Sequence, residues 1–498
     1  MAGSLFRTKS IDGLLAEVAA SGDATLKRTL GPASLVALGI GAIIGSGLFV
    51  RTAAAIAERS GPSVTLAFLV AGLGSAFAGL CYAEFASMIP IAGSAYTYSY
   101  ATMGELVAWI IGWDLVLEYA VGAATVAISW SEYFNRALEY VGLHIPFEWC
   151  HSPFEVMEGV GGGAHGIVNL PAVGILLILS ALLIRGTQES AFVNSLIVVT
   201  KVSIVLMVIA IGWGFMNPAN HTPYIPAPTN YTTGQGVVHP YGGVMGILGA
   251  AGVVFFAFIG FDAVSTAAQE AKNPKRDMPI GILGSLVVCT ILYVLFSHVL
   301  SGVATVDDFR TAGKEASVAF AITKYMTGYA WLAKFVTIAI LAGFSSVILV
   351  MLLGQSRVFY SMSNDGLVPK IFSEVHPKFQ TPYKSNMLFF VLTALFGGFI
   401  PGDIVGEMTS IGTLFAFMLV CAGVWIMRVR RPELVRGFTV PALPVVAVLG
   451  IVVCGAMIYG LGWTNWLRLV VWLVIGLVFY FSYGKNHSRL GTKGRIAA

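Results

Sequence analysis

Residues 37–49 read ALGIGAIIGSGLF, and positions 39 to 47 of this apolar run contain four glycines. Each glycine weakens a helix by roughly 1 kcal/mol relative to alanine. Unwound backbone is tolerated at membrane depth only where it lines a cavity inside the protein. The stretch therefore predicts a membrane helix that is interrupted near its middle.

A second glycine-rich apolar stretch, GAAGVVFFAFIGFD, covers residues 249–262. Aligning Ile44 and Gly45 with Ile259 and Gly260 gives an offset of 215 residues, close to the length of five helices with their loops. Interrupted helices at matching places in two halves indicate the binding site of a secondary transporter. The alternative is that the small residues serve close helix packing. The paired occurrence favours interruption, because packing does not require both breaks at the same depth.

The composition is that of a polytopic membrane protein. Of the 498 residues, 57% are hydrophobic and 11% are charged, and the mean hydropathy is +0.81. Soluble domains carry roughly 25% charged residues, so an ordinary soluble enzyme is excluded. At about 20 residues per span, the apolar content leaves room for a dozen helices.

Apolar runs between charged residues, prolines and glycines predict twelve spans, at 33–57, 62–88, 96–135, 167–185, 190–216, 241–270, 278–304, 329–361, 386–400, 404–428, 441–461 and 466–484. They divide the chain into an N-terminal segment (1–32), a first repeat (33–216), a second repeat (241–428), a final pair of spans (441–484) and a C-terminal tail (485–498). Twelve spans put both termini on one side of the membrane. The loops of that side hold about 20 basic residues against about eight opposite, so both termini are expected to be cytoplasmic.

Several other functions are disfavoured. The net charge is only +4, and no basic run is interleaved with aromatic residues, so nucleic acid is not an expected partner. The five cysteines and eight histidines show no disulfide framework and no metal-ligand spacing. No P-loop is present, and the spans lack the charged rings of a channel. We expect a transporter that is not an enzyme and that uses no cofactor and no metal.

Eight motifs are similar to those of the cationic amino acid transporter family, within the amino acid, polyamine and organocation superfamily. They are RTKSID (7–12), LKRTLG (26–31), VALGIGAIIGSGLFV (36–50), YAEF (82–85), PIAGSAY (90–96), GWDLVLEY (112–119), FDAVST (261–266) and RVFYSM (357–362). The resemblance covers roughly residues 5–485. It implies an all-α LeuT-like fold of two inverted five-helix repeats followed by two extra helices. Vertebrate members have fourteen spans, so twelve spans indicate a bacterial member in the cell membrane.

The resemblance also implies where an L-amino acid binds. A carboxylate and an ammonium are costly to bury without partners, and an opened helix offers free N–H and C=O groups. By resemblance, the carboxylate meets the N–H groups of Gly45, Ser46 and Gly47, and the ammonium meets the carbonyls of Ile43, Phe256 and Ile259. Phe256 would also gate the site from the outside; the alternative is that its ring only packs.

Three further residues are expected to support the pocket. Ser345 and Ser346 lie in a small-residue stretch of the eighth span and would leave volume beside the ligand, which permits a long side chain without demanding one. Asp262 follows the second break and would cap the second half-helix by accepting its free N–H groups.

Lys201 is the only basic residue deep inside a predicted span, about eleven residues from either end. At this depth its ammonium does not easily reach the membrane surface by snorkelling. A charged residue inside the membrane indicates a functional role by default. In sodium-independent relatives a lysine here takes the place of a sodium ion and bridges helices 1 and 8. We expect Lys201 to carry the coupling proton or to tether helix 1 near Gly41; a purely structural role is the alternative.

Two acidic positions complete the candidate site. Glu118 and Asp114 are one helical turn apart and share a face. Glu118 is expected to help hold the proton or to attract a cationic substrate; the alternative is that it only satisfies neighbouring polar groups. Glu84 and Arg357 lie near the cytoplasmic ends of their spans, where we consider a gating ion pair between them.

The leading interpretation is an alternating-access symporter of L-amino acids and protons. The alternative is a proton-independent uniporter or exchanger of cationic amino acids. The expected partners are the amino acid, H⁺ and membrane lipid. The sequence leaves open which amino acid is preferred, and whether the protein is a monomer or pairs with a small accessory membrane subunit.

Overall fold

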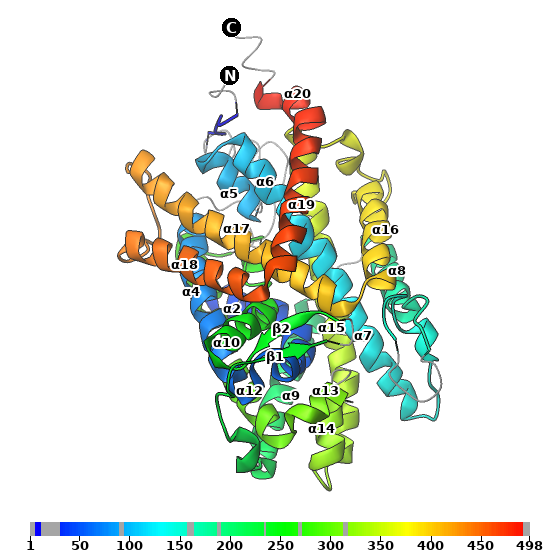
Figure 1. Ribbon diagram of the computed structural model, residues 1–498. Coiled ribbons are helices and arrows are strands. Elements are labelled where there is room, and N and C mark those ends of the chain that lie inside the picture. Colours follow the sequence, from blue (N-terminus) through cyan, green and yellow to red (C-terminus); the bar gives the residue numbers. More distant parts are fainter. Residues whose placement is uncertain are drawn as a thin grey trace.

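The computed structural model describes residues 5–10, 30–88, 94–156, 164–186, 191–233, 236–266, 271–311 and 317–491. Helices account for most of this part of the chain (Figure 1). The N-terminal segment and the C-terminal tail lie outside it except for residues 5–10, 30–32 and 485–491.

The first predicted span is interrupted, as the glycine pattern indicates. Helix α2 (Pro32–Ile43) ends at Ile43, and Ile44 is extended, with φ −71° and ψ 104°. The chain resumes helical turns in η3 (Gly47–Arg51), α3 (Thr52–Ala55), η4 (Ile56–Ser60) and η5 (Gly61–Ser63), which lead into α4 (Val64–Met88).

The predicted span at 96–135 is not one helix, which corrects the sequence-based boundary. Helix α5 (Ser94–Thr102) is separate from a continuous helix made of α6 (Glu105–Val116), η6 (Leu117–Val121) and α7 (Gly122–Glu139). Between them Gly104 has φ +97°, which glycine adopts readily. A Cβ atom there would lie 2.6 Å from the main chain of Phe6. The break therefore depends on a contact with a distant segment.

The chain then forms η7 (Phe147–Trp149), α8 (Leu170–Ile184), α9 (Ala191–Gly212), η8 (Trp213–Phe215) and η9 (Pro218–His221). A short antiparallel hairpin follows, formed by β1 (Thr229–Thr232) and β2 (Val238–Tyr241), with Thr229 opposite Tyr241.

The second half begins with another interrupted helix, made of α10 (Gly243–Val254), η10 (Phe255–Phe258) and α11 (Ala263–Thr266). The remaining elements are α12 (Pro274–Val303), α13 (Val306–Thr311), α14 (Ser317–Tyr325), α15 (Ala330–Asn364), η11 (Lys370–Phe372), α16 (Tyr383–Phe399), α17 (Gly402–Arg430), α18 (Leu443–Leu461), α19 (Trp463–Phe479), η12 (Tyr480–Gly484) and α20 (Lys485–His487).

Within the described residues, eight helical stretches are long and apolar enough to cross a membrane. Three shorter apolar helices, Pro32–Ile43, Leu170–Ile184 and Gly243–Phe258, add to them. Two of these three are short because their helices are interrupted. The protein is thus a multi-pass membrane protein, and the count of twelve spans and the division into two repeats stay predictions.

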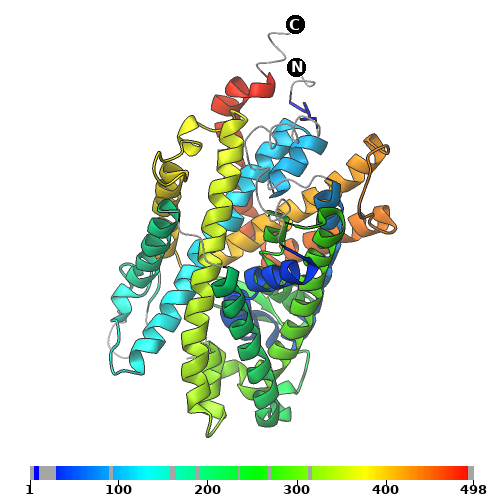
Figure 2. The ribbon, with the colours of Figure 1, turned by 180° about the vertical axis from the view of Figure 1, so that it is seen from behind.

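The helices pack in two groups that meet at the breaks. Helix α12 packs against α2 and α4, and α10 packs against α4. In the other group α15 packs against α7, and α8 packs against both α7 and α16. Figure 2 shows α15, in yellow-green, running along the length of the second group. The outer face of α19 exposes Leu467, Val470, Val471, Val474 and Val478, as expected of a surface that faces lipid.

Candidate functional site

The first break leaves carbonyl groups without their usual helical partners. The N–H of Ile44 still bonds to the carbonyl of Ile40 at 2.9 Å, and Leu48 bonds to Gly45 at 3.2 Å. The last carbonyls of a helix need partners from elsewhere. Here they come from side chains of two other helices, α9 and α12.

The second break has a different backbone but lies against the first. After the 3-10 turn η10, Ile259 is extended, with φ −61° and ψ 135°, and Gly260 has φ +113°. A Cβ atom on Gly260 would lie 2.8 Å from the carbonyl oxygen of Ala42. Glycine is needed here both for its dihedral angle and for the close approach of the first helix.

Two contacts join the breaks. A Cβ atom on Gly47 would lie 2.2 Å from the Cα of Ala257, so the two main chains touch at this point. Tyr293 of α12 places its hydroxyl 3.0 Å from the carbonyl oxygen of Ile43 and 2.9 Å from that of Ala257. Sequence reasoning missed Tyr293; the available signal was a tyrosine inside an apolar span, whose hydroxyl needs a partner.

The residues expected to bind the substrate converge on these breaks. All are buried, and they are Ile43, Gly45, Ser46 and Gly47 at the first break and Phe256 and Ile259 at the second. The Ser46 hydroxyl has no hydrogen-bond partner within the described part of the chain. Their role as ligands of an amino acid stays a prediction.

Lys201 bridges three helices. Its ammonium Nζ donates a 2.8 Å hydrogen bond to the carbonyl of Gly41, and its side chain is 2% exposed. A Cβ atom on Gly343 of α15 would lie 2.7 Å from its Cε. Gly343 therefore leaves room for the long side chain beside α15, while the hydrogen bond connects it to α2; the roles of Lys201 as a tether or a proton carrier stay predictions.

An acidic group lies near the second break. Asp114 and Glu118 are buried, and the carboxylate oxygens of Asp114 have no hydrogen-bond partner among the described residues. Asp262 and Thr413 lie beside Glu118. Tyr119 donates a 2.6 Å hydrogen bond to the carboxylate of Asp262, while the N–H of Ser265 bonds to the main-chain carbonyl of Asp262.

The wall of the site on α15 is more apolar than its serines suggest. The Ser345 hydroxyl accepts a 3.1 Å hydrogen bond from the indole of Trp130 and donates to the carbonyl of Leu341. Ser346 is buried. The α15 residue that faces Gly45 is Val347, whose Cγ2 lies 3.5 Å from the Cβ position of that glycine.

Aromatic rings cover one side of the first break. Phe49 packs edge-on against Phe296 at 5.8 Å between ring centroids and also contacts Phe344 at 6.3 Å. Tyr133 packs edge-on against Phe344 at 5.8 Å. This cover and the α15 wall give the site apolar surroundings.

Ion pairs lie toward both ends of the interrupted helices. Arg59 pairs with Glu407 of α17 at 2.9 Å, with both side chains largely buried. At the end of α4, Glu84 pairs with Arg428 and Arg436. Glu84 thus has two arginine partners other than Arg357, and the gating pair considered between Glu84 and Arg357 stays a prediction. The two arginines lie about 350 residues further along the chain, and no local pattern links them to α4.

Comparison with known proteins agrees with this architecture. Residues 30–484 match the amino acid permease family. The chain belongs to that family. This permease is 44% identical over 490 residues to the branched-chain amino acid permease BcaP of Bacillus subtilis (strain 168), covering 98% of this chain and 100% of that protein. It is 39% identical over 487 residues to the methylthioribose transporter of the same organism, covering 98% and 99%.

The permease is also 34% identical over 431 residues to the vacuolar cationic amino acid transporter 4 of Arabidopsis thaliana, covering 86% of this chain and 68% of that protein. The predicted membership of the amino acid, polyamine and organocation superfamily is confirmed. The family and these relatives are membrane transporters and not enzymes.

Proposed function

We propose that this permease is a secondary active transporter of L-amino acids that binds its substrate at the two helix breaks. The observation that carries the proposal is the convergence of both breaks on Tyr293, which lies within hydrogen-bond distance of a carbonyl in each. Matching breaks in two halves of a transporter are where substrates bind. The same breaks support a LeuT-like arrangement of repeats 33–216 and 241–428.

The main-chain groups at the two breaks suit the two charged groups of an amino acid. The N–H groups of Gly45, Ser46 and Gly47 begin the outer half of the first helix, where the positive end of the helix dipole favours a carboxylate. The buried hydroxyl of Ser46 supplies one more donor. The carbonyls of Ile43, Phe256 and Ile259 suit the ammonium.

The surroundings favour an apolar substrate side chain. Val347 faces Gly45, and the rings of Phe49 and Phe344 close the outer side. We therefore propose leucine, isoleucine and valine as the preferred substrates, in line with the BcaP relative that aligns over its whole length. A cationic amino acid, carried by exchange without protons, is the alternative that the cationic transporter relatives favour.

Proton coupling rests on Lys201 and Glu118. Lys201 donates to Gly41 from the place where a bound cation would hold the first helix. Glu118 is fully buried beside a second buried carboxylate, that of Asp262, and such burial is costly for charged carboxylates in a membrane. In this proposal the permease sits in the cell membrane with both termini cytoplasmic, and H⁺ moves with the amino acid.

Uptake into proteoliposomes tests the proposal. Purified permease is reconstituted, and labelled leucine uptake is measured with the lumen alkaline and with no pH gradient. We expect accumulation only with the gradient, and competition by isoleucine and valine. Competition by arginine, together with counterflow that does not depend on the pH gradient, would favour the cationic exchanger. Competition by methylthioribose alone would overturn amino acid transport.

A further inference from the structure

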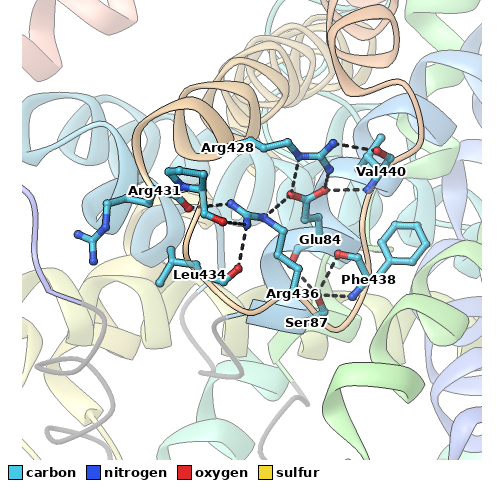
Figure 3. Close-up of polar contacts among 9 residues, drawn as sticks. Glu84, Ser87, Arg428, Arg431, Leu434, Arg436, Phe438 and Val440 are labelled. Carbon is cyan, nitrogen blue, oxygen red and sulfur yellow. Dashed lines mark hydrogen bonds and ion pairs between the residues drawn. The ribbon is translucent and has the colours of Figure 1, made fainter.

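The linker between α17 and α18 (residues 431–442) is fixed to the end of α4 by one buried carboxylate. The side chain of Glu84 is 1% exposed and accepts hydrogen bonds from Nε of Arg428 at 3.3 Å, Nε of Arg436 at 3.1 Å and the N–H of Val440 at 2.8 Å. Figure 3 shows both guanidinium groups turned toward this carboxylate. We call these four residues the Glu84 clasp.

Further bonds hold the linker in one path. The guanidinium of Arg436 donates to the carbonyls of Arg431 at 3.0 Å and Leu434 at 2.8 Å (Figure 3). The hydroxyl of Ser87 accepts a 3.1 Å hydrogen bond from the N–H of Phe438. Because the linker is anchored on α4 in this way, its remaining side chains have a fixed outward surface.

That outward surface and the last turn of α17 beside it combine charge with apolar side chains. Val429 is 71% exposed and Val435 is 75% exposed. Arg431 pairs with Glu433, and Arg430, between Val429 and Arg431, is exposed and has no acidic partner in the described part of the chain. A basic group flanked by exposed valines fits the boundary between lipid head groups and acyl chains.

The start of α12 extends the same surface. A Cβ atom on Gly437 would lie 2.5 Å from the Cβ of Lys275, so the linker lies directly on this helix. In Figure 2 the green α12 rises beside the orange linker. Lys272, Lys275 and Arg276 are exposed and have no acidic partner within the described ranges. With Arg430 they form what we call the basic edge.

The charge of this region is strongly one-sided. Segments 272–277 and 428–436, with Glu84, contain seven basic and three acidic side chains. All three acids are engaged: Glu84 in the clasp, Glu433 with Arg431, and Asp277 with the N–H of Asn273 at 3.0 Å. The four residues of the basic edge therefore carry a positive charge that no acidic side chain in the described part of the chain neutralises.

We propose that the basic edge binds the head group of an anionic phospholipid, with Val429 and Val435 reaching into the acyl region beside it. Clusters of basic residues at the end of membrane helices attract anionic lipid, and a soluble anion would make no use of the two valines. The bound lipid joins α12, which carries Tyr293, to the linker fixed on α4.

Lipid binding to the purified full-length permease tests this inference without any transport measurement. The variant Lys272→Gln/Lys275→Gln/Arg276→Gln/Arg430→Gln removes the basic edge. The variant Arg185→Gln/Lys370→Gln/Lys378→Gln/Lys485→Gln removes four other exposed basic residues and is the matched control. Affinity for phosphatidylglycerol and for phosphatidylcholine is read from the shift of the unfolding temperature as each lipid is added in detergent.

We expect the wild type and the control to bind phosphatidylglycerol about ten-fold more tightly than phosphatidylcholine, and the basic-edge variant to lose this preference. A retained preference in that variant, or an equal loss in the control, overturns the proposal. Glycerol phosphate is the third ligand; stabilisation equal to that by phosphatidylglycerol would assign the edge to a soluble anion. Val429→Gln/Val435→Gln should weaken phosphatidylglycerol binding, and unchanged binding would contradict the lipid orientation.

Discussion

The ammonium of Lys201 and the main-chain carbonyl of Gly41 are joined by a 2.8 Å hydrogen bond three residues before the first helix break. A lysine from α9 thus supplies a partner to a carbonyl at the end of α2. The bond connects an ionisable group to the end of α2, where the proposed substrate site lies. A change in the charge or position of Lys201 therefore affects the end of α2 directly.

Replacing Lys201 separates tethering from proton carriage. Lys201→Arg keeps a cationic donor, but a guanidinium does not release its proton in a protein. We expect this variant to retain leucine counterflow and to lose accumulation driven by the pH gradient, whereas Lys201→Ala loses both. Full gradient-driven uptake by Lys201→Arg would show that Lys201 is not the proton carrier.

Removing the hydroxyl of Tyr293 should weaken the junction of the two breaks. Tyr293→Phe keeps the ring, which packs on Phe68 and Phe258, but leaves the carbonyls of Ile43 and Ala257 without this donor. A buried acceptor without a partner costs about 1–3 kcal/mol, so we expect a lower unfolding temperature and slower uptake. The control is Tyr459→Phe, at a tyrosine that is 65% exposed; equal effects of both would contradict the prediction.

Adding one methyl group at Gly47 should separate the breaks. The Cβ of Gly47→Ala would lie 2.2 Å from the Cα of Ala257, and because that neighbour is main chain, one of the two segments must move. We expect leucine uptake to fall at least ten-fold. At Gly174 of α8 the same atom meets nothing within 4 Å, so Gly174→Ala should transport normally; similar activity in both variants would show that the close approach is dispensable.

Neutralising Glu84 should destabilise the permease. Glu84→Gln leaves two guanidinium groups beside a neutral amide, and breaking a buried ion pair costs about 3–5 kcal/mol. Glu433→Gln breaks an exposed pair with Arg431, for which the cost is about 0–1 kcal/mol. Thermal unfolding in detergent compares the two, and an equally small effect at Glu84 would argue against the clasp.

An aspartate outside the membrane spans should give acid sensitivity. Burial alone would raise the pKa of Asp308, but hydrogen bonds from Lys324, Tyr325 and Thr305 hold this pKa well below its ordinary value. A carboxyl whose pKa is lowered by folding stabilises the folded state above its unfolded pKa of about 3.9. This stability is lost as the pH falls from there toward the folded pKa.

We therefore expect the unfolding temperature of the wild type to fall more steeply between about pH 5 and pH 3 than that of Asp308→Asn. Parallel pH profiles of the two proteins would count against this assignment.

Local signals predicted the helix breaks better than they predicted the contacts between distant segments. Clustered glycines weaken a helix wherever they occur, so both breaks were predictable from short stretches. A lone lysine in a span needs a partner, but its expected position near Gly41 came from the family resemblance. The division at Gly104 depends on the packing of Phe6, and the partners of Glu84 come from α17 and its linker. Such contacts follow from the tertiary arrangement, which no short motif encodes.

The phenol of Tyr293 has a single hydrogen to share between two acceptors. In the proposed site the arriving ammonium also binds the carbonyl of Ile43, so the tyrosine and the substrate compete for that oxygen. When the amino acid leaves, the hydroxyl of Tyr293 again donates to this carbonyl. This exchange of donors limits the affinity for the substrate and favours its rapid release.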